Sequence, residues 1–146
     1  MKKFVITSLI GVLGIFSLLA QEKAMLEIRV NGLRNSEGKL SITLFNNEAG
    51  FPDDADKAVA WQTIDLSMKK PVFYFQDLPP GVYAYAILHD EDNDGEMKKN
   101  LFGIPKEGFG FSRNYSPRVK KPSFEDASVR LKEGKNLDII DIIYFF

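Results

Sequence analysis

The chain has 146 residues, a formal net charge of −1 and no cysteine. This length suits one domain with a real hydrophobic core. Without cysteine, the fold cannot depend on disulfides or on thiolate-bound metal. A slightly acidic chain with no basic stripe also argues against nucleic acid as a partner.

The first twenty residues predict export. Lys2 and Lys3 form a short positive segment, residues 4–19 are mainly apolar, and Ala20 is a small residue before a cleavage point. The apolar run has about 16 residues, whereas a membrane span needs about 20. We expect residues 1–20 to be a signal peptide and the mature protein to be periplasmic or secreted, without a membrane span. An uncleaved N-terminal anchor is the alternative.

After the signal, the hydrophobic pattern has period two, which is typical of β-strands. Apolar residues alternate with polar ones in residues 26–30 and again in 40–44, and residues 35–38 form a turn signal between them. We expect these two strands to pair as a hairpin with one buried face.

Later strands complete an all-β pattern. They are expected at residues 58–66, 71–75, 82–89, 127–132 and 136–144. In the strand at 82–89, which has the cleanest pattern, Tyr83, Tyr85 and Ile87 are predicted to lie on one face and alanines on the other. About seven strands predict one antiparallel Greek-key sandwich over residues 21–146. The apolar C-terminal tail would favour aggregation if exposed, so we expect a buried central strand, with a subunit interface as the alternative.

Residues 90–126 have no regular period and are too many for an ordinary connection. The segment contains several aromatic residues, whereas disordered segments contain few. We therefore expect one long ordered loop packed over an end or a face of the sandwich. Within it, Ser123 and Asp126 have the spacing of a capping box, which predicts one helical turn.

An acidic turn opens this loop. Asp90, Asp92 and Asp94 are spaced by two and are followed by Gly95, as in the first half of a calcium-binding loop. Glu96 would add a backbone carbonyl. The pattern predicts a calcium site with Asp90, Asp92, Asp94 and Glu96 as its ligands.

The second half of the calcium pattern is missing. Lys98 stands at the ninth position and Leu101 at the twelfth, where a helix-loop-helix calcium site has a bidentate Glu. Another oxygen, for example from Glu107, would have to complete the site. The alternative is a solvated acidic turn in which Asp and Asn occur for their turn propensity. Both interpretations are open at this point.

Five further residues of this region are candidates for ligand binding. They are His89, Glu107, Phe109, Phe111 and Ser112. His89 is the only histidine, so it is also the candidate general base of an enzyme. The chain has no G-x-S-x-G motif, and the alternative for His89 is a hydrogen bond into the acidic loop. For Phe109 and Phe111 the alternative is to cover an apolar surface.

The motifs occur in a recognisable order. LPPGVYAYAILHD (residues 78–90) is followed by EDNDG (91–95), GIPKEGFGFS (103–112) and PSFEDA (122–127). This order resembles an uncharacterised bacterial family of exported proteins, over about residues 25–145. Its members typically contain HDxNxNG, GIPxEGxGFS and PxFxDA before a last β hairpin. The resemblance implies a sandwich like transthyretin or the peptidase-associated regulatory domains, and it implies no established activity. The family commonly has Asp where Lys98 stands.

These observations predict an exported, non-enzymatic β-sandwich module. We expect it to bind a ligand, a glycan or a protein through the 90–126 loop, with calcium as a candidate stabilising ion. One alternative is a small hydrolase or transferase that uses His89 and the acidic turn. Another is a structural envelope component that self-associates.

Overall fold

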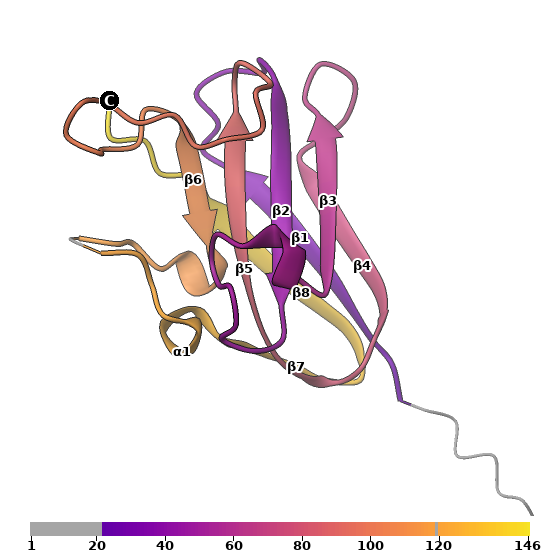
Figure 1. Cartoon of the computed structure of the whole chain (residues 1–146). Helices are drawn as coiled ribbons and strands as arrows, with labels where there is room; N and C mark the ends of the chain where they lie inside the picture. Colours follow the sequence, from indigo (N-terminus) through magenta and orange to yellow (C-terminus); the bar gives the residue numbers. More distant parts are fainter. Residues whose placement is uncertain (1–21, 119) are drawn as a thin grey trace, which may run out of the picture.

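The computed structural model describes residues 22–118 and 120–146, which form a two-layer β-sandwich (Figure 1). The predicted signal peptide lies outside the described residues. The strands are β1 (Ala24–Asn31), β2 (Lys39–Phe45), β3 (Ala60–Asp65), β4 (Val72–Leu78), β5 (Gly81–Asp90), β6 (Gly108–Phe111), β7 (Val129–Leu131) and β8 (Gly134–Asp141). The short helices are η1 (Ala55–Lys57), η2 (Ser112–Asn114) and α1 (Phe124–Ala127). In the described part of the chain, no helix has the length and apolar character needed to cross a membrane.

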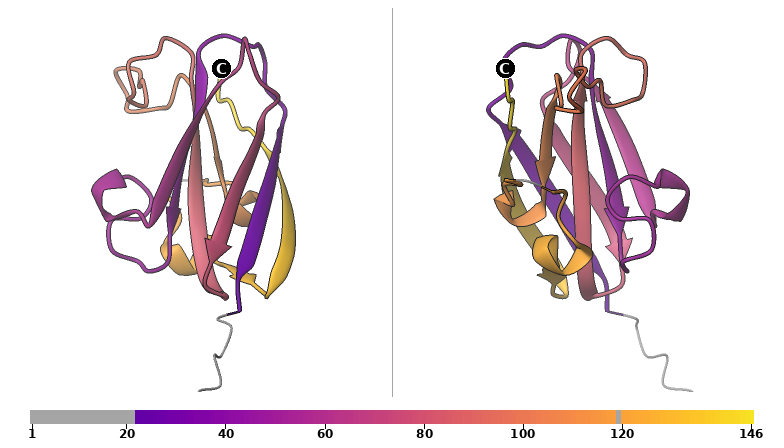
Figure 2. Two further views of the ribbon diagram at one scale, coloured as in Figure 1. Left: turned by 90° about the vertical axis from the view of Figure 1, so that its right-hand side faces the viewer. Right: turned by 60° about the vertical axis from the view of Figure 1, so that its left-hand side comes forward.

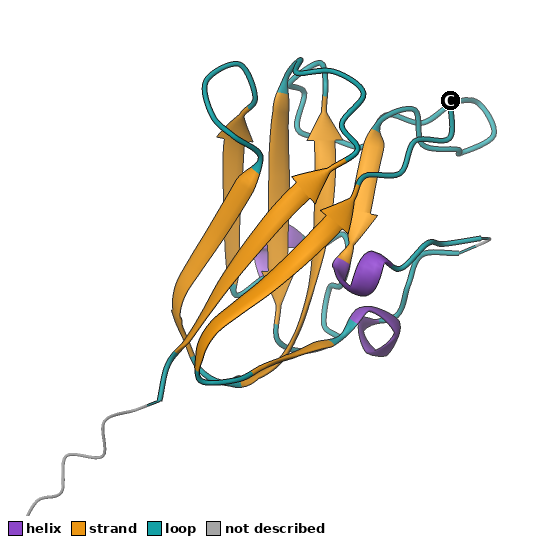
Figure 3. Ribbon diagram, turned by 180° about the vertical axis from the view of Figure 1, so that it is seen from behind, coloured by secondary structure: helices purple, strands orange, loops and turns teal. Residues whose placement is uncertain are grey.

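The predicted all-β sandwich is confirmed (Figure 3), and the described residues form eight strands. One sheet has the order β4-β1-β8, and the other has the order β3-β2-β5-β6, with β7 also paired to β5. The pairing is not purely antiparallel, because β8 runs parallel to β1, from Gly134 opposite Ala24 to Asp141 opposite Asn31. Parallel neighbours need a long crossover connection. Here almost the whole domain lies between the two strands.

The predicted hairpin between the first two strands is wrong. β1 pairs with β4 and β8, whereas β2 pairs with β3 and β5 in the other sheet. Period-two alternation identifies a buried face, but it does not identify the partner strand. Both buried faces point into one core from opposite layers, and the two layers are seen edge-on in Figure 2.

Residues 32–38 cross from β1 in one sheet to β2 in the other, and we call them the crossing segment. It ends at Gly38, where φ is +65° and an added Cβ would collide with the Asp90 carbonyl.

The C-terminal strand lies at a sheet edge, so the expectation of a buried central strand is wrong. β8 follows β1 in the sheet order, and β7 pairs with β5 rather than with β8. The isoleucine-rich run divides between two faces because side chains alternate along a strand. Ile140 and Ile142 are buried, whereas Leu137 and Ile139 are about half exposed.

β5 separates two hydrophobic clusters. Tyr83, Tyr85 and Ile87 share one face, as predicted, and this face points into the core between the sheets. On the opposite face, Ala84 and Ala86 pack against aromatic side chains of β6. These small side chains leave room for the phenylalanines that cover them.

Part of the long segment after β5 packs on the sandwich, as predicted, through β6, η2 and α1. β6 was not predicted as a strand, and residues 98–106 do not pack on the sheets. Ser123 Oγ accepts the Asp126 N–H at 3.2 Å, and the Asp126 carboxylate accepts the Ser123 N–H at 3.0 Å, which confirms the capping box. β6 extends the larger sheet beside β5. An added Cβ at Gly108 would collide with Ile142 and Tyr144, so glycine lets the C-terminal segment cross β6 closely.

Candidate functional site

The acidic turn is folded around the buried side chain of Asp90, the last residue of β5. One carboxylate oxygen accepts the Asp94 N–H at 3.2 Å, and the other accepts the Gly95 N–H at 2.9 Å. Asn93 and Gly95 have φ values of +63° and +84°, which these residue types tolerate. Lys39 Nζ lies 3.2 Å from the same carboxylate. A buried charge is therefore both paired and hydrogen-bonded, as burial requires.

Glu107 closes the turn from the other side. Its side chain is buried, and its two oxygens accept the Glu91 N–H at 2.9 Å and the Lys98 N–H at 3.0 Å. One carboxylate thus joins the first and last parts of the turn. Carboxylate oxygens of Asp90, Asp92 and Glu107 lie within 4.8 Å of one another.

The predicted calcium ligands are only partly brought together. Asp90 and Asp92 belong to this group, and Glu107 joins them as the additional oxygen considered above. The Asp94 carboxylate instead accepts the Glu96 N–H at 2.8 Å, and Glu96 itself is exposed. Grouped carboxylates are the ligands that a hard cation such as calcium prefers.

Two lysine side chains already pair with carboxylates of the Asp90, Asp92 and Glu107 cluster. Lys98 forms an ion pair with Asp92, and Lys39 forms one with Asp90. A calcium ion would have to compete with both ammonium groups. The ligand set Asp90, Asp92, Asp94 and Glu96 therefore stays a prediction.

Arg34, in the segment that crosses from β1 to β2, links the acidic turn to two other parts of the chain. Its guanidinium donates to the Glu91 carboxylate, to the Lys106 carbonyl at 3.1 Å and to the Phe146 carbonyl at 2.8 Å. It also lies 4.6 Å from the centre of the Tyr144 ring. The bond from Arg34 holds the pKa of Glu91 below its ordinary value. The acidic turn, the loop after it and the C-terminus are thus held by one side chain.

A narrow loop, residues 98–106, extends from this anchored base, and we call it the 98–106 ribbon. The Lys106 N–H donates to the Lys98 carbonyl at 2.8 Å, and the Asn100 N–H donates to the Ile104 carbonyl at 2.9 Å. The Asn100 side-chain oxygen accepts the N–H groups of Phe102 and Ile104 at 2.9 and 3.0 Å. Because these bonds are internal, the ribbon has a defined shape without packing on the sheets.

The tip of the ribbon is apolar and exposed. Leu101 is fully exposed, Phe102 is 88 % exposed and Ile104 is 38 % exposed. Figure 2 shows this loop standing away from the two sheets. Ordered apolar side chains that project into solvent mark a contact surface more often than singly scattered ones do.

His89 is completely buried, and both of its ring nitrogens have partners. Nε2 lies 2.9 Å from the Glu37 carbonyl, and Nδ1 lies 2.6 Å from the Tyr144 hydroxyl. A carbonyl only accepts, so Nε2 carries a proton and donates to the Glu37 carbonyl, while Nδ1 shares a hydrogen bond with the Tyr144 hydroxyl. Burial raises the pKa of the Tyr144 hydroxyl, which keeps it a donor. The imidazole thus joins the segment between β1 and β2, at Glu37, to the segment after β8, at Tyr144.

The remaining predicted ligand-binding residues are also buried. Phe109 and Phe111 belong to the second hydrophobic cluster, on the outer face of β5. Ser112 Oγ donates to the Ala127 carbonyl at 2.5 Å and accepts the Tyr85 N–H at 3.0 Å. Together with Glu107 and His89, these side chains build the base of the loop and do not reach its surface.

The exposed residues that the sequence reasoning missed are Leu101, Phe102 and Ile104. The calcium pattern marks Leu101 only as an unsuitable ligand. The signal that was available is the position of these apolar residues beside Gly103, between lysines and without strand periodicity. An apolar group at a turn has no sheet face to cover.

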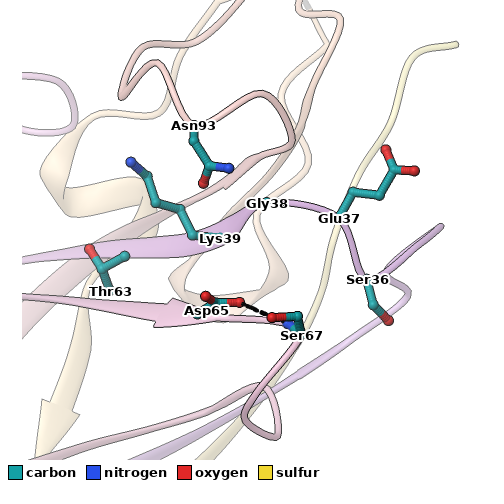
Figure 4. A pocket seen from close by; sticks show the side chains of 8 residues that line it. All are labelled: Ser36, Glu37, Gly38, Lys39, Thr63, Asp65, Ser67 and Asn93. Atoms are coloured by element: carbon teal, nitrogen blue, oxygen red, sulfur yellow. Dashed lines mark hydrogen bonds between the residues drawn. The ribbon is translucent and has the colours of Figure 1, made fainter.

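A polar hollow of about 440 Å³ lies near the other side of the acidic turn (Figure 4). Its lining includes Lys39, Thr63, Asp65, Ser67 and Asn93. The Asp65 carboxylate accepts the Ser67 hydroxyl at 2.7 Å and the Ser67 N–H at 2.9 Å, and these bonds lower its pKa. Ligand pockets are usually enclosed and mostly apolar. This hollow is a weaker candidate for binding than the ribbon.

Comparison with known proteins gives one family match. Residues 28–139 match the family of uncharacterised proteins conserved in bacteria, DUF2141. The chain belongs to this family. No curated protein and no solved structure gives a significant match. The DUF2141 match covers most of the described sandwich, including the acidic turn and the ribbon, so both belong to the family's own domain and not to an appended segment.

Proposed function

We propose that this chain is an exported, non-enzymatic binding module that contacts its partner through the tip of the 98–106 ribbon. The main support for this proposal is that Leu101 and Phe102 are exposed on a loop whose backbone is hydrogen-bonded internally. Exposure of two large apolar side chains is unfavourable in water. A contact that covers them would remove that cost.

The base of the ribbon supports this role. Glu107 bonds to both sides of the acidic turn, and Arg34 bonds to the ribbon at Lys106. A pre-shaped binding loop loses little conformational freedom when it binds. The acidic turn then serves as the support of the contact and not as the contact itself.

The buried state of His89 supports a non-enzymatic role over the alternative of a small hydrolase. Both ring nitrogens are hydrogen-bonded inside the protein, so a substrate would have to displace Glu37 or Tyr144 to reach them. A general base must lie within hydrogen-bond reach of the proton it removes. The hydrolase alternative predicts turnover in a broad substrate screen that His89→Gln abolishes.

The binding proposal is tested by following where the exported protein is retained. The full chain is expressed in a bacterium, and its distribution between soluble and envelope fractions is measured together with the N-terminus of the mature form. We expect an N-terminus at Gln21 and retention in the envelope fraction. Leu101→Ser with Phe102→Ser is expected to release the protein into the soluble fraction.

A matched control removes apolar surface elsewhere. Val59 and Met68 are 45 % and 79 % exposed and lie outside the ribbon. Val59→Ser with Met68→Ser is expected to leave the distribution unchanged. Equal distributions for the wild type and the ribbon variant would overturn the proposal.

The outer face of the three-stranded sheet favours a second candidate function, self-association. Tyr74 and Leu137 lie in register on either side of Glu27 and are 50 % and 51 % exposed. Lys135 and Arg29 form ion pairs with Glu27. This candidate predicts a molar mass that rises with concentration and that Leu137→Lys returns to the monomer value. A wild type that is monomeric at all concentrations contradicts it.

A further inference from the structure

We propose that the partner of the 98–106 ribbon is the surface of an anionic lipid bilayer. This inference rests on the proposed function, because it names the partner of the same loop. Three properties of the ribbon carry it: the chemistry of its tip, the charge around the tip and the small size of the contact.

The tip has the composition of an interfacial anchor. Leu101 and Phe102 are the most exposed apolar side chains at the turn, and Ile104 adds a partly exposed third. Such side chains gain by entering the boundary between headgroups and acyl chains. The N–H groups of residues 100 and 102–104 and the carbonyls of Asn100 and Ile104 are already bonded within the ribbon. A shallow insertion would therefore carry few unsatisfied backbone groups into the bilayer.

The charge around the tip matches an anionic surface. Residues 97–106 contain three lysines and no acidic residue. The charge of Lys98 is offset by Asp92, but Lys99 and Lys106 are exposed on the two sides of the ribbon. Lysines near a bilayer are attracted by anionic headgroups. Their alkyl stems can lie along the apolar region while the ammonium group stays in water. The acidic residues Asp94 and Glu96 precede the ribbon in the chain.

The size of the contact favours a bilayer over a protein. A stable protein interface buries about 800 Å² on each partner. The ribbon presents a narrow projecting tip with three apolar side chains, not a broad face. A fluid bilayer closes around a small projecting tip, whereas a protein would need a preformed pocket of matching shape.

The test uses the chain that begins at Gln21, since both sheets and both hydrophobic clusters lie within residues 24–144. Binding is measured by cosedimentation with vesicles of phosphatidylcholine alone or with about 30 % phosphatidylglycerol. We expect binding to be about tenfold tighter with phosphatidylglycerol and weaker in about 0.5 M NaCl.

Two variants separate the apolar and electrostatic contributions. Leu101→Ser with Phe102→Ser is expected to weaken binding to phosphatidylglycerol vesicles at least about tenfold. Lys99→Glu with Lys106→Glu is expected to abolish the preference for phosphatidylglycerol. The control Val59→Ser with Met68→Ser should bind like the wild type. Thermal unfolding of each variant establishes that it is folded, because all these side chains are substantially exposed.

The outcomes separate the lipid proposal from the binding proposal. If the wild type does not bind phosphatidylglycerol vesicles, or if the Leu101 and Phe102 substitutions leave vesicle binding unchanged, the lipid assignment is overturned. If the same substitutions still release the protein from the envelope fraction, the ribbon binds another partner, such as a protein with an apolar groove. If they change neither result, both proposals fail.

Discussion

Two neighbouring parts of one segment place similar side chains in opposite environments. In the 98–106 ribbon, Phe102 is 88 % exposed, whereas in β6 Phe109 and Phe111 are 5 % and 8 % exposed. The difference is the surface beneath them. β6 pairs with β5, whose small Ala84 and Ala86 side chains accept the phenylalanines. The ribbon lies beyond the end of that pairing and has no such face.

Different interactions hold the two parts in place. The second hydrophobic cluster fixes β6 by packing, together with backbone bonds between Phe109 and Ile143 at 3.1 and 2.8 Å. Polar bonds from Asn100, Glu107 and Arg34 fix the ribbon and its base. An apolar tip can therefore remain exposed, because its shape does not depend on burying its own side chains.

The largest expected effect contrasts two phenylalanines. Phe109→Ala should lower the free energy of unfolding by about 3–5 kcal/mol, because it leaves a cavity against β5. Phe102→Ala should change it by less than about 0.5 kcal/mol, because the side chain is solvated. Urea unfolding followed by circular dichroism measures both. Similar losses for the two variants would mean that the ribbon packs on the domain.

The next effect concerns Arg34, which joins the ribbon to the rest of the fold. Arg34→Ala should lower the free energy of unfolding by about 1–2 kcal/mol, because it removes charge-assisted bonds to Glu91 and two carbonyl bonds. Amide hydrogen exchange in residues 98–106 should also become faster. The control is Lys57→Ala, which removes the exposed ion pair with Asp54 and should cost less than about 0.5 kcal/mol. Unchanged exchange in the ribbon would contradict its anchoring by Arg34.

A pH titration sharpens the same point. The Arg34 bond holds the pKa of Glu91 below its ordinary value of 4.5, so ionised Glu91 stabilises the folded state above that pH. This contribution is lost as the pH falls through the lowered pKa. We expect the stability difference between wild type and Arg34→Ala to be constant near neutral pH and to shrink below about pH 4.5. A difference that stays constant down to about pH 2 would contradict the coupling.

The smallest expected effect is that of calcium on the base of the ribbon. Because Lys98 and Lys39 already pair with Asp92 and Asp90, millimolar calcium should raise the Tm of the wild type by less than about 1 °C. Lys98→Asp should increase the calcium-dependent shift to several degrees, since it replaces an ammonium group with a carboxylate. A chelator serves as the control. A large chelator-reversible shift in the wild type would establish the calcium site predicted from the sequence.

The strands were largely predictable, but their partners were not. Alternation along 26–30 and 40–44 correctly indicated two half-buried strands, yet these belong to different sheets. Alternation is the same whether two successive strands pair in one sheet or lie in opposite sheets, because in both cases one face of each strand is buried in the core. The isoleucine-rich tail was similarly ambiguous, because β8 places Ile140 in the core and Ile139 at the surface.

The grouping of acidic residues was predictable from the sequence, but which loop residues are exposed was not. Asp90, Asp92 and Glu107 do meet, as the acidic pattern and its need for an additional oxygen suggested. The residues chosen for ligand contact, His89 among them, are buried instead, and the exposed residues Leu101 and Phe102 were not chosen. Residue type indicates what a side chain can bind, whereas exposure depends on which elements cover it.

The sequence alone determined the all-β class and the helical turn begun by Ser123, because both depend on local periodicity or spacing. Tertiary structure alone decided that β8 lies parallel to β1 at a sheet edge. It also decided that Phe109 is covered while Phe102 projects into solvent. These outcomes depend on contacts between residues far apart in the chain, where a surface such as the alanine face of β5 exists only after the sheets have assembled.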